Sequence, residues 1–388
     1  MIEILAKKFI KDHENIQSPA VRSAYGTLCS SVGIVLNLLL CAGKLAAGLI
    51  SGSVAIVADA LNNLSDAGSS IVTLLGFKLA GKKPDADHPF GHGRMEYLSG
   101  LAVAMLILLM GFEMLKTSFE KIRFPEAIVF SWVSVGVLLA SIGVKFYMSA
   151  YNRRIGEKIH STAMAATAVD SLSDCISTVA VLIATVVGGF TPFQIDGYAG
   201  LVVACFILFA GYNAARDTIS PLLGQAPDEE LVHTIYSVVL EYPHIVGIHD
   251  LVVHDYGPGR LMVTLHAEVP AHMDILAIHD EIDNAEKELR RVLNCEATIH
   301  MDPIVTADPK VAAMREEVMK LIVSIDERIT IHDFRIVPGA SHTNVLFDAV
   351  VPMDCELSES EVKAEIARLV RTMDGNCFAV VEIDRSYV

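Results

Sequence analysis

Long apolar segments dominate the first half of the chain and constrain its fold more than any other feature. Each is long enough to cross the hydrocarbon core of a bilayer, which takes about 20 mostly apolar residues in a helix. We therefore predict a transmembrane domain of six helices over residues 25–220, preceded by a cytosolic segment of residues 1–24. The six segments are residues 28–50, 54–79, 97–119, 127–151, 162–190 and 195–215.

Basic residues indicate which side of the membrane the loops occupy. Arg22, the loops around Lys82 and Arg153, and Arg216 all fall on the same side of the predicted bundle. Cytosolic loops carry an excess of Lys and Arg, so we expect this side and both termini to be cytosolic. The protein would then be a multi-pass protein of the cell (inner) membrane. One basic loop near Lys121 lies on the opposite side and is an exception to the pattern.

The pattern changes after Pro221, where amphipathic helices and short alternating strands replace the apolar runs. A helix over 228–240, strands over 249–253 and 261–269, a helix over 274–293 and a strand over 296–301 follow in order. The order α-β-β-α-β predicts a ferredoxin-like α+β domain over residues 221–305. The net charge of −16 arises largely here, and such acidity argues against nucleic acid as a partner.

Four oxygen-bearing side chains lie inside two of the predicted spans. Asn62 and Asp66 are four residues apart in the second span, and Asp170 and Asp174 repeat this spacing in the fifth. Residues four apart share a helix face, so two facing helices could gather all four groups around one point. An ionised residue in a membrane span costs about 2.5–3.5 kcal/mol, and neighbouring carboxylates repel unless a cation or protons neutralise them. The pattern predicts a site that exchanges a metal ion for protons.

These two pairs, together with the segment DADHPFGHGRME at residues 85–96, resemble the cation diffusion facilitators. The resemblance covers about residues 18–303. It implies a homodimeric metal/proton antiporter in the lipid bilayer, with six spans and a cytosolic metal-binding domain per subunit, and no enzymatic activity. It also implies two further metal sites. One is a loop site of Asp85, His88 and His92, and the other is a cytosolic site of His249, His266, His279, His300 and Asp302.

The donor atoms of the transport site indicate which ion it takes. All four positions offer oxygen, which suits Mn²⁺ better than the imidazole-preferring Zn²⁺. We expect export of Mn²⁺ from the cytosol, with Zn²⁺, Fe²⁺ and Co²⁺ as alternatives and no resident cofactor. A membrane metal sensor that does not transport is a rival from another class. A second rival, an intramembrane aspartyl protease, would need a GxGD-type motif, which the sequence lacks.

The last 83 residues of the chain, 306–388, repeat sequence motifs of the domain before them. Ile248-His249-Asp250 recurs as Ile331-His332-Asp333, and His300-Met-Asp302 corresponds to Glu382-Ile-Asp384, at an offset of 82 to 83 residues. We predict a second ferredoxin-like unit. Most imidazoles are replaced, which favours a packing or dimer-extending module, with a weak acidic manganese-like site as the alternative. The metal-site equivalents are His332, Asp348, Glu382 and Asp384.

Overall fold

The computed structural model of the protein has two compact units. The first contains Met1–Gln225 and Asp255–Arg260, and the second contains Ala226–His254 and Leu261–Val388. The residues that the structure describes are 2–16, 18–51, 54–124, 131–190, 195–304, 308–339, 341–373 and 376–386.

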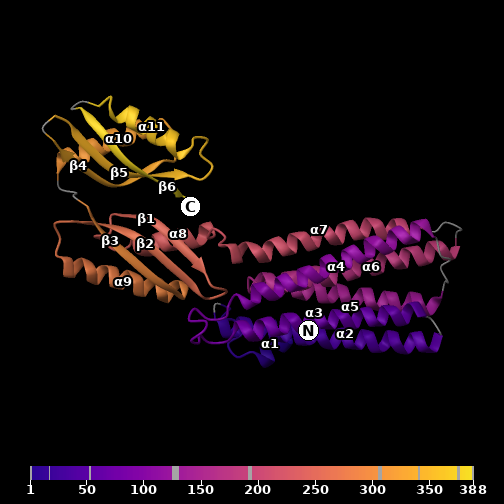
Figure 1. The fold of residues 1–388 in the computed structure, drawn as a ribbon. Coiled ribbons are helices and arrows are strands. Elements are labelled where there is room, and N and C mark those ends of the chain that lie inside the picture. The colour runs from indigo at the N-terminus through magenta and orange to yellow at the C-terminus, as the bar shows by residue number, and fades with distance from the viewer. Residues whose placement is uncertain are drawn as a thin grey trace. The chain divides into compact units, whose positions relative to one another are not determined.

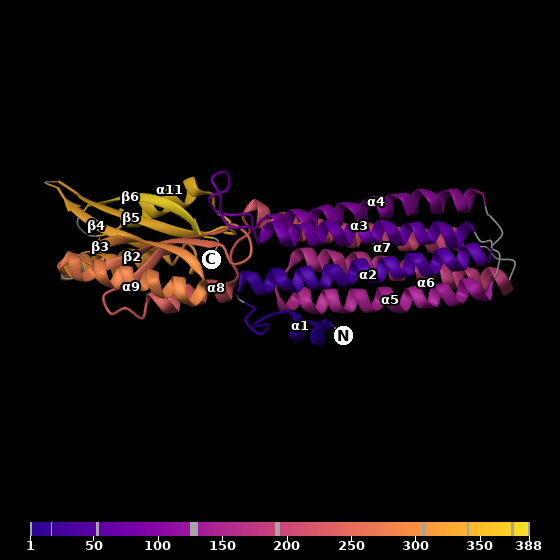
Figure 2. The same cartoon turned by 90° about the horizontal axis from the view of Figure 1, so that it is seen from below.

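The first unit is a bundle of long helices that run side by side (Figures 1 and 2). Among the described residues, helices α2, α4, α5, α6 and α7 are long and apolar enough to cross a membrane. Helix α3 is 27 residues long and packs between α2 and α4. The helices are α1 (Ile2–Phe9), α2 (Pro19–Ser51), α3 (Val54–Ala80), α4 (Met95–Arg123), α5 (Trp132–Lys158), α6 (Thr162–Phe190) and α7 (Asp196–Leu223).

Small residues let α3 approach its two neighbours closely. A Cβ added at Gly26 of α2 would lie 2.4 Å from the ring of Phe77 of α3. A Cβ added at Gly76 of α3 would lie 2.1 Å from the hydroxyl oxygen of Ser99 of α4. Close backbone approach of this kind is how helices associate in lipid. These contacts lie near the C-terminal end of α3, about three turns after Asp66.

The first module of the second unit has the order of helices and strands predicted from the sequence. Its strands form a sheet in the order β1-β2-β3, with β2 and β3 parallel. The side chains of Val263, Leu265, Ala267 and Val269 alternate along β2 and are buried against the helices. The elements are α8 (Glu229–Val239), β1 (Gly247–Asp255), β2 (Leu261–Pro270), α9 (Ile275–Leu293) and β3 (Cys295–Ile304).

The second module, after residue 308, has the same order of elements. Its sheet runs β4-β5-β6, with β4 antiparallel and β6 parallel to β5, and its two helices cover one face (Figure 1). Asp250 and Asp333, which follow His249 and His332, both have a φ of 51°. The predicted boundary at residues 305 and 306 lies outside the described residues. The elements are α10 (Pro309–Ile322), β4 (Thr330–Pro338), β5 (Thr343–Pro352), α11 (Glu359–Val370) and β6 (Cys377–Ser386).

Candidate metal sites

Three buried carboxylates meet inside the helix bundle. Asp66 of α3 is 3% exposed, and Asp170 and Asp174 of α6 are 4% and 5% exposed. The ammonium of Lys145 on α5 lies between two of them, with its Nζ atom 2.6 Å from Asp66 Oδ2 and 2.7 Å from Asp174 Oδ2. Asp170 lies within electrostatic range of the same three groups. The predicted carboxylates of the two helices are therefore brought together, around a fixed positive charge.

Lys145 is the residue of this cluster that the sequence analysis did not name. It lies in the predicted span at residues 127–151, and its side chain is only 3% exposed. An ionisable residue within a membrane span is itself a signal of function, so the sequence did contain the clue. Lys44, in the first predicted span, is likewise buried at 3% and adds positive potential near Asp66. The site thus contains internal cations that the prediction from acidic residues alone did not include.

The structure places Asn62 differently from the sequence prediction. The side chain of Asn62 is exposed, whereas its neighbour Asn63 is 2% exposed and its Nδ2 donates a hydrogen bond of 3.1 Å to Asp66 Oδ2. Asp66 is turned toward Lys145 on α5, so a residue one turn earlier does not have to share its neighbours. The Oδ1 atoms of Asn63 and Asp174 accept no hydrogen bond within the described residues. Both buried oxygens are thus available to an ion.

The loop between α3 and α4 brings Asp85, His88 and His92 together. Asp85 Oδ1 lies 3.5 Å from His88 Nδ1, and Asp85 Oδ2 lies 3.5 Å from His92 Nε2. The backbone N–H of His88 also donates to Asp85, which holds the pKa of this carboxyl below its ordinary value. One carboxylate facing two imidazoles could hold a metal ion at a partly exposed position, where His92 is 11% and His88 60% exposed.

The rest of this loop segment has a packing role within the first unit. The guanidinium of Arg94 donates to the carbonyl oxygen of Asp255 at 2.8 Å, and the hydroxyl of Tyr97 donates to Asp255 Oδ2 at 2.6 Å. A Cβ at Gly93 would lie 2.6 Å from the carbonyl oxygen of Tyr256. The segment therefore combines possible metal donors with residues that hold the turn after Asp255 in place.

Most of the predicted cytosolic site is assembled in the first module. Asp302 is central, with Oδ2 2.9 Å from His266 Nδ1 and 3.2 Å from His249 Nε2, and Oδ1 3.2 Å from His300 Nε2. The parallel register of β2 and β3 places His266 directly opposite His300. His279 is the exception, because its side chain is exposed on α9 and belongs to no cluster of metal donors among the described residues.

The second module assembles a smaller set of donors at the corresponding strands. His332, Asp348 and Asp384 offer ligand atoms within 4.8 Å of one another. His332 and Asp348 are directly opposite in the antiparallel register of β4 and β5. Burial raises the pKa of Asp348 above its ordinary value. Glu382, predicted as a fourth equivalent, is exposed and lies outside this group.

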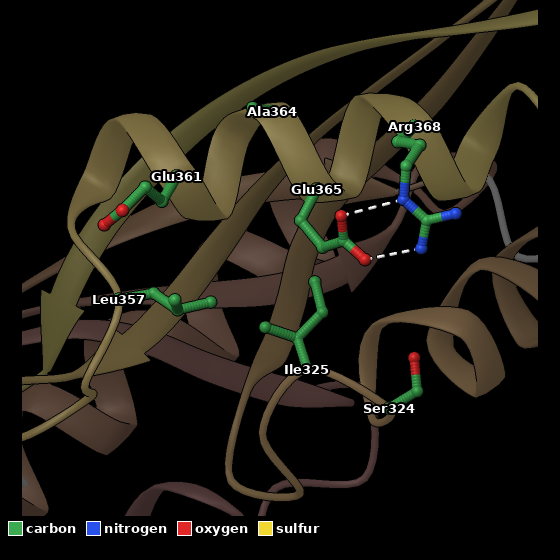
Figure 3. A pocket seen from close by; sticks show the side chains of 7 residues that line it. All are labelled: Ser324, Ile325, Leu357, Glu361, Ala364, Glu365 and Arg368. Atoms are coloured by element: carbon green, nitrogen blue, oxygen red, sulfur yellow. Dashed lines mark hydrogen bonds and ion pairs between the residues drawn. The ribbon is translucent and has the colours of Figure 1, made fainter.

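A pocket on the second module is lined by none of these donors (Figure 3). Glu365 and Arg368 of α11 pair with each other at its edge, with Nε to Oε2 at 2.8 Å, rather than pointing their charges into the pocket. Because these two charges neutralise each other, neither is free to bind a charged ligand in the pocket. The lining residues are Ser324, Ile325, Leu357, Glu361, Ala364, Glu365 and Arg368.

Comparison with known proteins identifies the family. A family model of the cation efflux transmembrane domain matches residues 30–223, and one of the cytoplasmic domain of cation efflux proteins matches residues 227–304. An uncharacterized transporter of Methanocaldococcus jannaschii is 32% identical over 272 residues, which cover 70% of this chain and 96% of that protein. The chain belongs to the cation diffusion facilitator family.

Other relatives in the family agree with this assignment. The cation-efflux pump FieF of Klebsiella pneumoniae subsp. pneumoniae is 28% identical over 288 residues, covering 73% of this chain and 95% of the pump. FieF of Yersinia enterocolitica is 27% identical over 255 residues, 65% of this chain and 84% of that protein. The chain is thus a multi-pass membrane protein for the efflux of divalent cations. It is a transporter and not an enzyme.

Proposed function

We propose that the protein exports Mn²⁺ from the cytosol in exchange for protons, through a site built on Asp66, Asp170 and Asp174. The observation that carries this proposal is the buried contact of Lys145 with Asp66 and Asp174. A buried carboxylate without a counter-charge is strongly disfavoured. A metal ion that enters must displace the ammonium, and when the ion leaves, the ammonium or protons must take its place. Alternation between these cations is the basis of an antiport cycle.

The donor atoms favour a hard divalent ion at this site. The buried groups around Lys145 present carboxylate and amide oxygens, with no imidazole among the contacts of the described residues. Oxygen donors suit Mn²⁺, whereas imidazole suits Zn²⁺. We include Asn62 as a fourth residue of the transport path, because its exposed side chain one turn before Asp66 could meet the ion on its way in. Zn²⁺, Fe²⁺ and Co²⁺ are the alternative cargoes.

We further propose that the protein crosses the inner membrane of the cell six times, with α3 as the second span. Both termini would then lie in the cytosol, and the protein would act as a homodimer. Helix α3 supports this topology because it packs between α2 and α4 and carries Asp66 in its middle. The equal order of elements and the 82-residue offset between β2 and β5 support the proposal that residues 306–388 are a duplicated copy of the first cytosolic module.

Flux in proteoliposomes tests the transport proposal. Wild-type protein should carry Mn²⁺ down its gradient and release protons in the compartment that the metal leaves, and should do so faster for Mn²⁺ than for Zn²⁺ or Fe²⁺. Asp66→Asn should lose this flux, while Asp217→Asn, an exposed carboxylate on α7, should keep it. Metal binding without flux in the wild type would instead make the protein a sensor. Equal flux in Asp66→Asn would reject the site.

A further inference from the structure

Two buried imidazoles, one from each cytosolic module, stack on each other. His249 of β1 is 6% exposed and His332 of β4 is 5% exposed. Their ring centroids are 3.9 Å apart, and the ring planes differ by 19°. All four ring nitrogens are buried and make no hydrogen bond within the described residues. Buried polar atoms are nearly always hydrogen-bonded. A neutral imidazole has one nitrogen with a free lone pair, so each ring points to a ligand that accepts that lone pair.

Carboxylates surround this pair at the spacing of metal ligands. His332 Nε2 lies 3.3 Å from Asp384 Oδ2 and 4.0 Å from Asp250 Oδ1. The other oxygen of Asp250, Oδ2, lies 3.5 Å from His249 Nδ1. Asp250 therefore presents one oxygen toward the donors of each module.

We propose that the two cytosolic modules share a divalent metal ion, held by His332, Asp348 and Asp384 of the second module and by Asp250 of the first. The site lies beside the cluster of His249, His266 and Asp302. Asp250 connects the two positions through its two oxygens. One imidazole and three carboxylates form a harder donor set than the neighbouring cluster, so the ion is of the Mn²⁺ class.

The repeat explains how this site could arise. His332 occupies in β4 the place of His249 in β1, and Asp348 in β5 and Asp384 in β6 stand 82 residues after His266 and Asp302. The strand positions that carry donors are thus kept, while the donor type changes from nitrogen to oxygen at β5. A module that served only for packing would have no need to retain a buried imidazole without a hydrogen bond at the place of His249.

Metal stoichiometry of the purified full-length protein tests this inference independently of transport. Equilibrium dialysis against Mn²⁺, with metal counted by mass spectrometry, should show one fewer tightly bound ion per chain in His332→Ala and in Asp384→Asn. Asp384→Asn is isosteric and decides the result if His332→Ala does not fold. His342→Ala and Glu356→Gln change exposed residues of the same module and should keep the wild-type count. An unchanged count in Asp384→Asn would overturn the proposal.

A double-mutant cycle tests whether the ion belongs to both modules. Asp250→Asn and His332→Ala should each weaken Mn²⁺ binding at this position by about tenfold or more, and the double variant should lose little beyond the larger single effect. Asn tolerates the left-handed backbone of Asp250. Asp333→Asn, with the same φ in the second module, is the matched control and should bind normally. If the loss of Mn²⁺ affinity in the double variant equals the product of the two single losses, the two residues act at independent sites, which would contradict a shared ion.

Discussion

In the proposed transport cycle we expect Lys145 to compete with the transported ion for Asp66 and Asp174, which its ammonium contacts. Replacing it by Gln removes the ammonium but keeps a polar side chain of similar reach. Asp66 and Asp174 then lose the positive side chain that neutralises them, so Mn²⁺ should bind more tightly. The Mn²⁺ concentration for half-maximal binding should fall about tenfold, equivalent to about 1.4 kcal/mol of binding free energy. Mn²⁺ titration of purified protein checks this result, and Lys158→Gln at the end of α5 is the control. Weaker binding in Lys145→Gln would mean that Lys145 organises the site instead of competing for it.

The two neighbouring asparagines of α3 should affect transport differently. Asn62 is exposed one turn before Asp66, whereas Asn63 is buried and donates to Asp66. Asn62→His adds an imidazole on the proposed path of the ion and should raise Zn²⁺ flux relative to Mn²⁺ several-fold. Asn63→His removes the hydrogen bond to Asp66 and should lower the flux of both metals alike. The ratio of the two fluxes in proteoliposomes separates these outcomes, and a shifted ratio in Asn63→His alone would assign selectivity to Asn63.

At the scale of elements, α3, which carries Asp66, packs closely on α4. Gly76→Val places a Cβ against Ser99, and overpacking of this kind costs about 1–3 kcal/mol. We expect a lower midpoint of thermal unfolding in detergent and reduced flux. Gly143→Val on α5 is a matched control, because nothing lies within 4 Å of the added Cβ. Equal midpoints for the two variants would show that the close approach of α3 and α4 does not limit stability.

At the scale of the whole molecule, the second cytosolic module should be separable from transport. The chain covers 95% of FieF of Klebsiella pneumoniae with 73% of its own length, so that pump works with a shorter chain. Deleting the chain from Asp308 onward should therefore preserve Mn²⁺ flux within about twofold, because none of the buried carboxylates is removed. Flux and bound metal are measured on the same preparation. Complete loss of flux in a folded, membrane-inserted truncation would make this module part of the transport machinery.

The sequence by itself determined the features that depend on local pattern and composition. Apolar length predicts membrane helices, alternation predicts the strands of both modules, and acidic residues within apolar spans predict Asp66, Asp170 and Asp174 as a buried group. These signals are local because a helix or strand repeats its side-chain direction every few residues. The motif around His88 and His92 carried the family resemblance in the same way.

Only the tertiary structure decided which distant side chains meet. Lys145 lies 79 residues after Asp66 and 29 before Asp174, and its contact with both depends on the packing of three helices. The rotation of α3 within the bundle decides that Asn63 is buried and Asn62 is exposed. The stack of His332 on His249 follows from the contact of two separate sheets. Pairings of this kind are set by side-chain packing between elements, which no periodicity along the chain encodes.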